Sequence, residues 1–342
     1  MKKKKNFIII GAGWMGCHLA LTLMKQGHQV KLFEQKKIFN GMSGANTNRL
    51  HMGYHYPRSF QTRMQSKFGY KEFIKKYPTL NKKIKNNLIY LVKKYSLIDF
   101  QSYKKIMISS NLKIKKTTYF KDELSNIEGL FKVNEAQILQ NKSKKFFKSK
   151  LGNSLFENKE VKLDQLKFGK KICFENEYFD YLVDCSAGHL FNKKEFDISY
   201  EPRVTWIYRS KLKNFALMAM DGQFYNIFPH NEDFILGTPK YSKYKKINNL
   251  RLAIKFVKEI KKKDISKRRF QSEKIVKDTF VNFNKYFIYK SYFISLTTIF
   301  NSSSDNRPTL VKKKGNIISV LGGKIDTIFE AEKKIMKMLK IN

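Results

Sequence analysis

A glycine turn between a short strand and a helix, close to the N-terminus, constrains this chain more than any other feature. Residues 7–10 form an apolar run rich in β-branched side chains, which is typical of a buried parallel strand. Apolar residues at helical spacing then continue to Gly27, and a second strand over residues 29–33 ends in Glu34. The residues of the turn that we expect to contact a nucleotide are Gly11, Gly13, Trp14, Met15 and Gly16. Together these parts predict a dinucleotide-binding βαβ unit.

Each part of this unit has a physical task. Gly11 permits the tight turn, Gly13 lets the backbone approach a pyrophosphate, and Gly16 allows the helix to pack closely on the strand. The N-terminus of the helix then faces the phosphates. Glu34 is placed to accept hydrogen bonds from the adenosine ribose, and its charge disfavours the 2′-phosphate of NADP. The same unit serves NAD and FAD, so it does not by itself select the cofactor.

The charge of the chain raises nucleic acid as a possible partner. The formal net charge is +41 over 342 residues, with 69 lysines and arginines against 28 acidic residues. Lysines greatly outnumber arginines and lie in short scattered runs, whereas phosphate-reading surfaces favour arginine and gather their charge in one stripe. We therefore expect no specific nucleic acid partner. The rival reading is a basic nucleic-acid-binding protein whose Rossmann unit is only structural.

The cysteines and the apolar runs indicate the compartment. Cys17, Cys173 and Cys185 have neither metal-ligand spacing nor an even number, so we expect no metal site and a reducing environment. No run approaches the roughly 20 apolar residues of a transmembrane helix. The sequence thus predicts a cytoplasmic protein with no transmembrane segment.

A second motif follows the βαβ unit and points to the cofactor. Residues 40–57 read NGMSGANTNRLHMGYHYP, which resembles the D-amino-acid oxidase superfamily of FAD enzymes, the group of glycine and sarcosine oxidases. Within it, residues 51–57 are similar to the L-2-hydroxyglutarate oxidase branch. The resemblance implies that Ser43, Gly44 and Asn46 run along the FAD pyrophosphate and that the next residues reach the isoalloxazine ring.

The resemblance recurs in three later segments. Residues 181–188 match an apolar strand that ends in Ala187 and Gly188, where the family's backbone returns to the FAD. Residues 305–308 resemble an Arg-Pro motif whose arginine, here Arg307, often holds a substrate carboxylate. A strand over residues 317–321 leads to the last segment, which in the family lies beside the flavin N1/C2 edge and here contains Gly322, Gly323 and Lys324.

Because these segments are far apart in the sequence, the resemblance implies interleaved domains. The expected fold is α/β, a Rossmann-type FAD-binding domain with an interleaved α+β substrate domain built on an antiparallel sheet. The FAD-binding domain takes residues 1–75, 151–195 and 296–342, and the substrate or cap domain takes 76–150 and 196–295.

The residue pattern also predicts elements of the substrate domain. Strands at 204–208, 215–220, 223–229 and 234–238 are expected to form an antiparallel sheet, with helices at 60–77 and 245–262. Residues 71–150 and 241–286 carry no family motif.

The resemblance implies that a substrate carbon bearing an amine or hydroxyl gives a hydride to flavin N5. His51 or His55 is suited to accept the accompanying proton, and Arg307 to grip a carboxylate. Two interpretations of Arg49 stay open. Its side chain either pairs with the pyrophosphate or the substrate, or it lies exposed on the surface. The expected substrate is a small amino or hydroxy acid, with a sugar-like or phosphorylated compound as the alternative. Oxygen, a quinone or another carrier then reoxidises the flavin.

Overall fold

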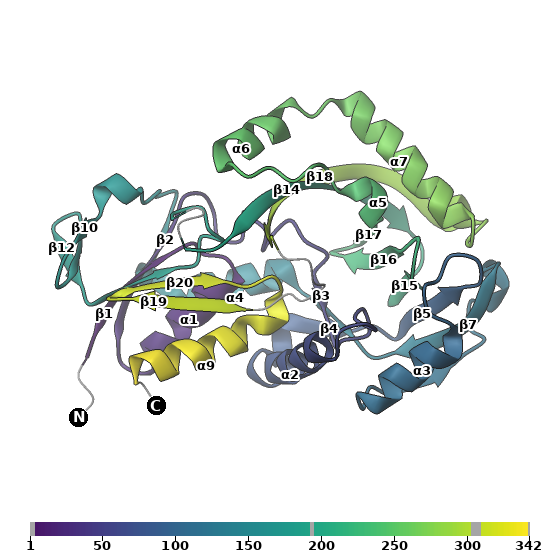
Figure 1. Cartoon of the computed structure of the whole chain (residues 1–342), viewed down its shortest axis with the longest axis horizontal. Helices are drawn as coiled ribbons and strands as arrows, with labels where there is room; N and C mark the ends of the chain where they lie inside the picture. The colour runs from purple at the N-terminus through teal and green to yellow at the C-terminus, as the bar shows by residue number, and fades with distance from the viewer. Residues whose placement is uncertain (1–3, 192–194, 302–308, 341–342) are drawn as a thin grey trace.

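The computed structural model describes residues 4–191, 195–301 and 309–340, and two large sheets lie next to each other along its longest axis (Figure 1). The first sheet has the strand order β19-β20-β13-β1-β2-β9. Its strands are β1 (Asn6–Ile10), β2 (Gln29–Glu34), β9 (Leu155–Glu157), β13 (Tyr181–Asp184), β19 (Leu310–Lys314) and β20 (Ile317–Leu321). Neighbouring strands are parallel except for the antiparallel pair of β19 and β20. The predicted strands around the glycine turn, at residue 181 and at residue 317 are confirmed.

Helices cover one face of the first sheet. They are α1 (Trp14–Lys25), α2 (Phe60–Lys76), α4 (Gln140–Leu151) and α9 (Ile328–Leu339). Their apolar side chains form one core with β1, as the fully buried Phe7, Cys17 and Phe147 illustrate. The predicted helix at 60–77 is confirmed, and it ends before Pro78, which begins a short 3₁₀ turn.

A small antiparallel sheet packs on the opposite face of the first sheet. Its strands are β10 (Lys167–Phe168), β11 (Ile172–Phe174) and β12 (Glu177–Phe179). Ile172 and Phe179 pack there against Ile8 and Ile10 of β1. The side chains of β1 therefore alternate between two cores, which explains why the strand reads as a continuous apolar run.

The second large sheet has the order β18-β14-β17-β16-β15-β5-β7-β6. Its strands are β5 (Asn86–Val92), β6 (Ile114–Lys116), β7 (Ile127–Val133), β14 (Ile198–Ser210), β15 (Phe215–Met220), β16 (Tyr225–His230), β17 (Asp233–Gly237) and β18 (Phe287–Phe300). All neighbours are antiparallel except β15 and β5. The predicted antiparallel sheet is confirmed, and the α/β class with it.

The helices of this half lie outside the second sheet. They are α3 (Phe100–Ser109), α5 (Pro239–Ser242), α6 (Leu250–Glu259), α7 (Lys262–Lys277) and α8 (Phe283–Tyr286), and Figure 1 shows α6 and α7 as an arc over β14 and β18. The helix predicted at 245–262 is confirmed over α6, residues 250–259, but its predicted start is wrong because residues 245–249 are not helical. Lys243 and Ile247 instead form bridges to β14, and α6 begins only after Asn249, whose side chain accepts the Leu252 N–H.

A three-stranded sheet lies between the two halves, in the order β3-β8-β4. Its strands are β3 (Arg49–Leu50), β4 (Asn81–Lys83) and β8 (Ala136–Ile138). Arg49 pairs with Gln137 and Leu50 with Ala136. Continuing this antiparallel register by one residue sets His51 opposite Glu135. The pairing thus brings a motif-free segment to the segment that resembles a flavin-facing stretch.

The division into two interleaved domains stays a prediction. The strands of the first sheet come from residues 6–34, 155–184 and 310–321, and those of the second from residues 86–133 and 198–300. Helix α4 packs in the core of the first sheet although all of it except Leu151 lies within residues 76–150. Among the described residues, no helix has the length and apolar character that crossing a membrane requires.

Candidate active site

The glycine turn has the geometry that a nucleotide-binding turn requires. Gly11 has a φ of +99°, and a Cβ there would lie 2.7 Å from the carbonyl oxygen of Cys185. A Cβ on Gly16 would lie 2.0 Å from the carbonyl oxygen of Gly11, so both positions demand glycine. Glu34 closes the turn, because its Oε2 accepts the Ala12 N–H at 2.9 Å. A carboxylate has further acceptor capacity, so Glu34 still fits a ribose hydroxyl.

The loop of residues 41–48 lies against the start of α1. The Trp14 N–H donates to the Ser43 Oγ at 2.9 Å, and a Cβ on Gly13 would lie 2.7 Å from that oxygen. A Cβ on Gly44 would lie 1.9 Å from the Phe39 carbonyl oxygen. The Asn46 amide donates to the carbonyls of Met42 and Ser43. The loop is therefore held closely beside the helix N-terminus.

A cavity of about 620 Å³ begins at this turn and reaches the second sheet. Eleven of the residues expected from sequence line it, namely Gly13, Trp14, Met15, Ser43, Asn46, His51, His55, Ala187, Gly322, Gly323 and Lys324. Five expected residues, Gly11, Gly16, Glu34, Gly44 and Gly188, do not line it. Gly11, Gly16, Glu34 and Gly44 shape the turn and loop, and the carbonyl of Gly188 accepts the Tyr200 hydroxyl at 3.0 Å. Arg307 lies outside the described residues.

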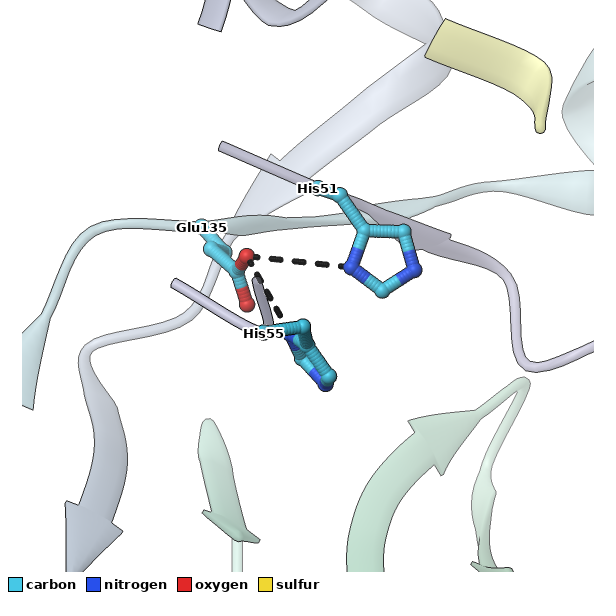
Figure 2. A group of neighbouring side chains, drawn as sticks. All are labelled: His51, His55 and Glu135. Atoms are coloured by element: carbon cyan, nitrogen blue, oxygen red, sulfur yellow. Dashed lines mark ion pairs between the residues drawn. The ribbon is translucent and has the colours of Figure 1, made fainter. Parts of the chain in front are cut away.

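His51 and His55 face one buried carboxylate at the inner end of this cavity. The Nδ1 atom of each histidine lies 3.9 Å from Oε1 of Glu135, and Figure 2 shows both rings turned toward that oxygen. The rings meet edge to face with centroids 4.6 Å apart. The side chain of Glu135 is fully buried, while those of His51 and His55 are 19% and 11% exposed. A solvent-shielded carboxylate thus lies beside two imidazole rings that can accept or donate a proton.

Arg49 supplies the positive charge next to Glu135. Its Nε lies 3.2 Å from Oε2 of Glu135, and its guanidinium lies 4.1 Å from the centre of the Phe228 ring. Burial raises the pKa of Glu135, and the nearby Arg49 opposes that rise. Because a guanidinium stays protonated, we take the pair as ionised. Arg49 is therefore neither exposed nor among the residues at the pyrophosphate turn.

Other polar groups complete the environment of Glu135. Its Oε1 accepts the Met52 N–H at 3.0 Å, and its Oε2 accepts the Asn87 amide at 3.4 Å. The oxygen of Asn87 in turn accepts from Arg49 at 3.3 Å. Sequence reasoning missed Glu135 and Asn87 because both lie in a stretch without motif. The signal that would have found Glu135 is a lone acid between the apolar residues of two short strands.

The geometry opposes a metal ion at these three residues, although one ligand atom from each of His51, His55 and Glu135 lies within 4.8 Å of the others. A metal on Nδ1 of His55 would require the proton on Nε2. Nη1 of Arg49 lies 2.7 Å from that Nε2, and a guanidinium only donates. Nε2 therefore carries the lone pair and Nδ1 the proton.

Polar side chains of the second sheet form the cavity wall opposite the glycine turn. These residues, which sequence reasoning did not single out, are Arg203, Thr205, Asn226, Ser295 and Thr297. The first two belong to β14 and alternate with the buried Val204. Because the side chains of a strand alternate between its faces, the polar members of β14 reach the cavity while the apolar ones pack in the core.

Positive charge dominates the cavity lining. Arg49, Arg58, Arg203, Lys243 and Lys324 line the cavity, whereas Asp221 is the acidic side chain among the described lining residues. Asp221 forms an ion pair with Arg58. Carboxylates outside the lining also lie beside three of these cations, namely Glu135 at Arg49, Glu201 at Arg203 and Asp326 at Lys324, and they offset part of the positive charge. The arginine side chains keep further N–H donors that can bind an anionic ligand.

Lys324 is not a solvated surface lysine. Its side chain is 4% exposed, and its Nζ donates to the Ser66 Oγ at 2.8 Å. The same nitrogen lies 4.9 Å from the centre of the Tyr56 ring and 3.6 Å from Oδ2 of Asp326. The Gly322 and Gly323 backbone beside it lines the cavity.

Fold, glycine turn and cavity together define a Rossmann-type dinucleotide-binding protein. A family model, FAD dependent oxidoreductase, matches residues 6–86. The FAD-dependent monooxygenase FPY4 of Fusarium mangiferae is 30% identical over 334 residues, which cover 97% of this chain and 90% of that protein. This chain therefore belongs to the D-amino-acid oxidase family of FAD-dependent oxidoreductases.

Solved structures resemble the whole chain in fold. The L-α-glycerophosphate oxidase of Mycoplasma pneumoniae superposes with a TM-score of 0.71 at 16% identity, covering 99% of this chain and 95% of its own. Glycine oxidase from Geobacillus kaustophilus gives a TM-score of 0.70 at 10% identity, with the same coverage. At such identities the likeness concerns the fold.

Proposed function

We propose that this enzyme oxidises a small anionic amino or hydroxy acid at the carbon that bears the amine or hydroxyl. One observation carries the proposal. The cavity that is lined by the glycine turn is also lined by His51 and His55, together with three arginines and two lysines. A proton acceptor and an anion-binding wall are the two features that such a substrate needs from the protein.

The protein's part in this reaction is to bind, orient and deprotonate the substrate. When bound, FAD supplies the hydride acceptor at its N5 atom. Gly13, Ser43 and Asn46 would lie along the pyrophosphate, with Ala187 near the ADP part and Gly322 and Gly323 beside the flavin. One of the two histidines would take the hydroxyl or ammonium proton. Arg307 and the cationic wall residue Arg203 would hold the carboxylate.

The absorption spectrum of the purified protein is the first test. We expect flavin absorption bands that correspond to about one flavin per protein molecule. Under anaerobic conditions, one of three pooled compound classes should bleach these bands: amino acids, hydroxy acids or phosphorylated hydroxy compounds. Bleaching by an uncharged sugar alone would contradict the anionic substrate. Arg203→Met is expected to raise KM for the bleaching compound more than it lowers kcat, with Tyr178→Phe, at an exposed residue, as the control.

Monooxygenation is a second candidate, favoured by the full-length similarity to a protein whose name states that activity. The two reactions differ in their demands. An oxidase needs no added reductant and leaves both atoms of O₂ in peroxide. A monooxygenase of this kind places one atom from labelled O₂ in the product and requires an external source of electrons. Mass spectrometry of the product from ¹⁸O₂ separates them.

A further inference from the structure

We propose that Glu135 and Arg49 divide the roles of the two histidines, so that His55 stays neutral as a positioning residue and His51 accepts the substrate's proton. The inference rests on the proposed function, which leaves open which histidine acts. It assigns a positioning role to Glu135, a residue of a segment that carries no family motif.

The hydrogen bond between Arg49 and His55 carries the first step. Nη1 of Arg49 lies 2.7 Å from Nε2 of His55. Since guanidinium has donors and no acceptor, Nε2 of His55 must offer its lone pair. The single proton of the neutral ring then lies on Nδ1, which faces Oε1 of Glu135. Protonating Nε2 would abolish this hydrogen bond and set two cations against each other.

The placement of His51 carries the second step. Its Nδ1 also faces Oε1 of Glu135 at 3.9 Å, and its side chain is the more exposed of the two toward the cavity. The Glu135 carboxylate nearby favours the charged imidazolium of His51, whereas the guanidinium that donates to His55 opposes a positive charge on that ring. A proton taken from a substrate hydroxyl or ammonium group would therefore be held on His51, and the bond that breaks is the O–H or N–H of the substrate.

The surrounding fold fixes the position of the Glu135 carboxylate and the tautomer of His55. The β3–β8 register sets Glu135 opposite His51, and the Met52 N–H and the Asn87 amide hold its carboxylate. The T-shaped contact between the rings fixes their mutual orientation. Glu135 thus acts on the reaction through the histidines rather than on the substrate.

Other titratable groups facing the cluster do not compete for the proton near neutral pH. Burial raises the pKa of Tyr70 to about 12 and also raises the pKa values of Tyr54 and Tyr103, so these phenols stay neutral. The remaining charged groups nearby are Asp326, whose carboxylate raises the pKa of Glu135, and Lys324, which lies beside the Tyr56 ring. Tyr56 itself contacts both histidine rings.

The direct test is NMR of the full-length protein labelled with ¹⁵N and ¹³C in histidine, with and without FAD. His51→Asn and His55→Gln identify the two signals among the six histidines. We expect His55 in the neutral form with its proton on Nδ1 from pH 6 to 8, while His51 titrates. A titrating His55, or a His55 proton on Nε2, overturns the proposal. This measurement needs no substrate, so it separates failure of the present inference from failure of the proposed function, which the flavin spectrum reports.

Kinetics with the bleaching substrate give the second readout. His51→Asn is expected to lower kcat by about 10² or more, whereas His55→Gln, whose amide oxygen can still accept from Arg49, should lose less than tenfold. Glu135→Gln should move the acidic limb of the kcat/KM profile down by about one pH unit, and Glu135→Asp should restore it. An unshifted limb in a Glu135→Gln variant with normal flavin content overturns the proposal. So does stoichiometric Zn²⁺ binding that His51→Asn abolishes, because the cluster would then be a metal site.

Discussion

The two ends of the cavity are built in different ways. The glycine turn and the loop of residues 41–48 come from one stretch of about 40 residues, and backbone atoms make their decisive contacts. The histidine end joins β3 to residues 87 and 135, which approach only through strand pairing. Backbone geometry sets the first end and a buried network of side chains sets the second. The first end should therefore tolerate no added atom at Gly11, Gly16 or Gly44, and the second should tolerate no lost charge.

The largest effect is expected at the glycine turn. Gly16→Val would place a side chain where a Cβ alone lies 2.0 Å from the Gly11 carbonyl oxygen. The strand and helix must separate to admit it, so we expect loss of flavin from the purified protein. The flavin-to-protein ratio measures this. Gly41→Ala is the matched control in the adjoining loop, because its Cβ would meet no atom within 4 Å, and it should keep full flavin content.

A smaller effect, on stability, is expected at the histidine end. Glu135→Ala leaves the buried Arg49 guanidinium without its carboxylate, which should lower the free energy of unfolding by about 3 to 5 kcal/mol. Urea unfolding followed by circular dichroism measures the loss. Glu259→Ala breaks the exposed pair with Lys255 and should change stability by less than about 0.5 kcal/mol. Equal losses in the two variants would mean that burial of Glu135 contributes nothing.

A second buried carboxylate, at the FAD end, sharpens the comparison. Asp184 lies at the end of β13, where burial raises its pKa to about 6 and the Ser186 N–H donates to it at 2.8 Å. The described groups that shift its pKa besides burial are Ser186, through hydrogen bonds, and the carboxylate of Glu195, whereas Glu135 has the cation Arg49 beside it. Its folded pKa is above the unfolded value of about 3.9, so its contribution to stability is full below pH 4 and is lost as the pH rises through 6.

Asp184→Asn removes this dependence on pH while its side-chain oxygen can still accept from Ser186. We expect the variant to be more stable than the wild type at pH 7.5, by about 2 kcal/mol, and no more stable at pH 4. Urea unfolding at the two pH values gives the difference. The corresponding Glu135→Gln variant should show no gain at pH 7.5, since there the charge has Arg49 as its partner. A gain in stability at pH 7.5 in both variants would show that Arg49 does not compensate the charge of Glu135 and that the two carboxylates do not differ.

Several parts of the fold could be predicted from local patterns in the sequence. The apolar run before Gly11, the acid at residue 34 and the strands near residues 181, 215 and 317 all lie where the sequence predicts them. Their signals are local, since burial on both faces demands a continuous apolar run and the turn demands glycine. The helix predicted at 245–262 exists over residues 250–259, but it starts later than predicted because a bridge to β14 holds residue 247. This nonlocal pairing outweighs helix periodicity at that point.

By itself the sequence determined the nucleotide-binding turn, the flavin-facing loop and the two histidines as candidates, because each depends on residues close together in the chain. Only the tertiary structure decided their electrostatic setting. Glu135 lies 84 residues from His51 and 80 from His55 in the sequence and reaches them through the β3–β8 register, and Arg49 is buried by Phe228 of β16. Strand pairing and burial determine whether a side chain is charged and which of its atoms carries the proton. The spacing of residues along the chain does not show either of these.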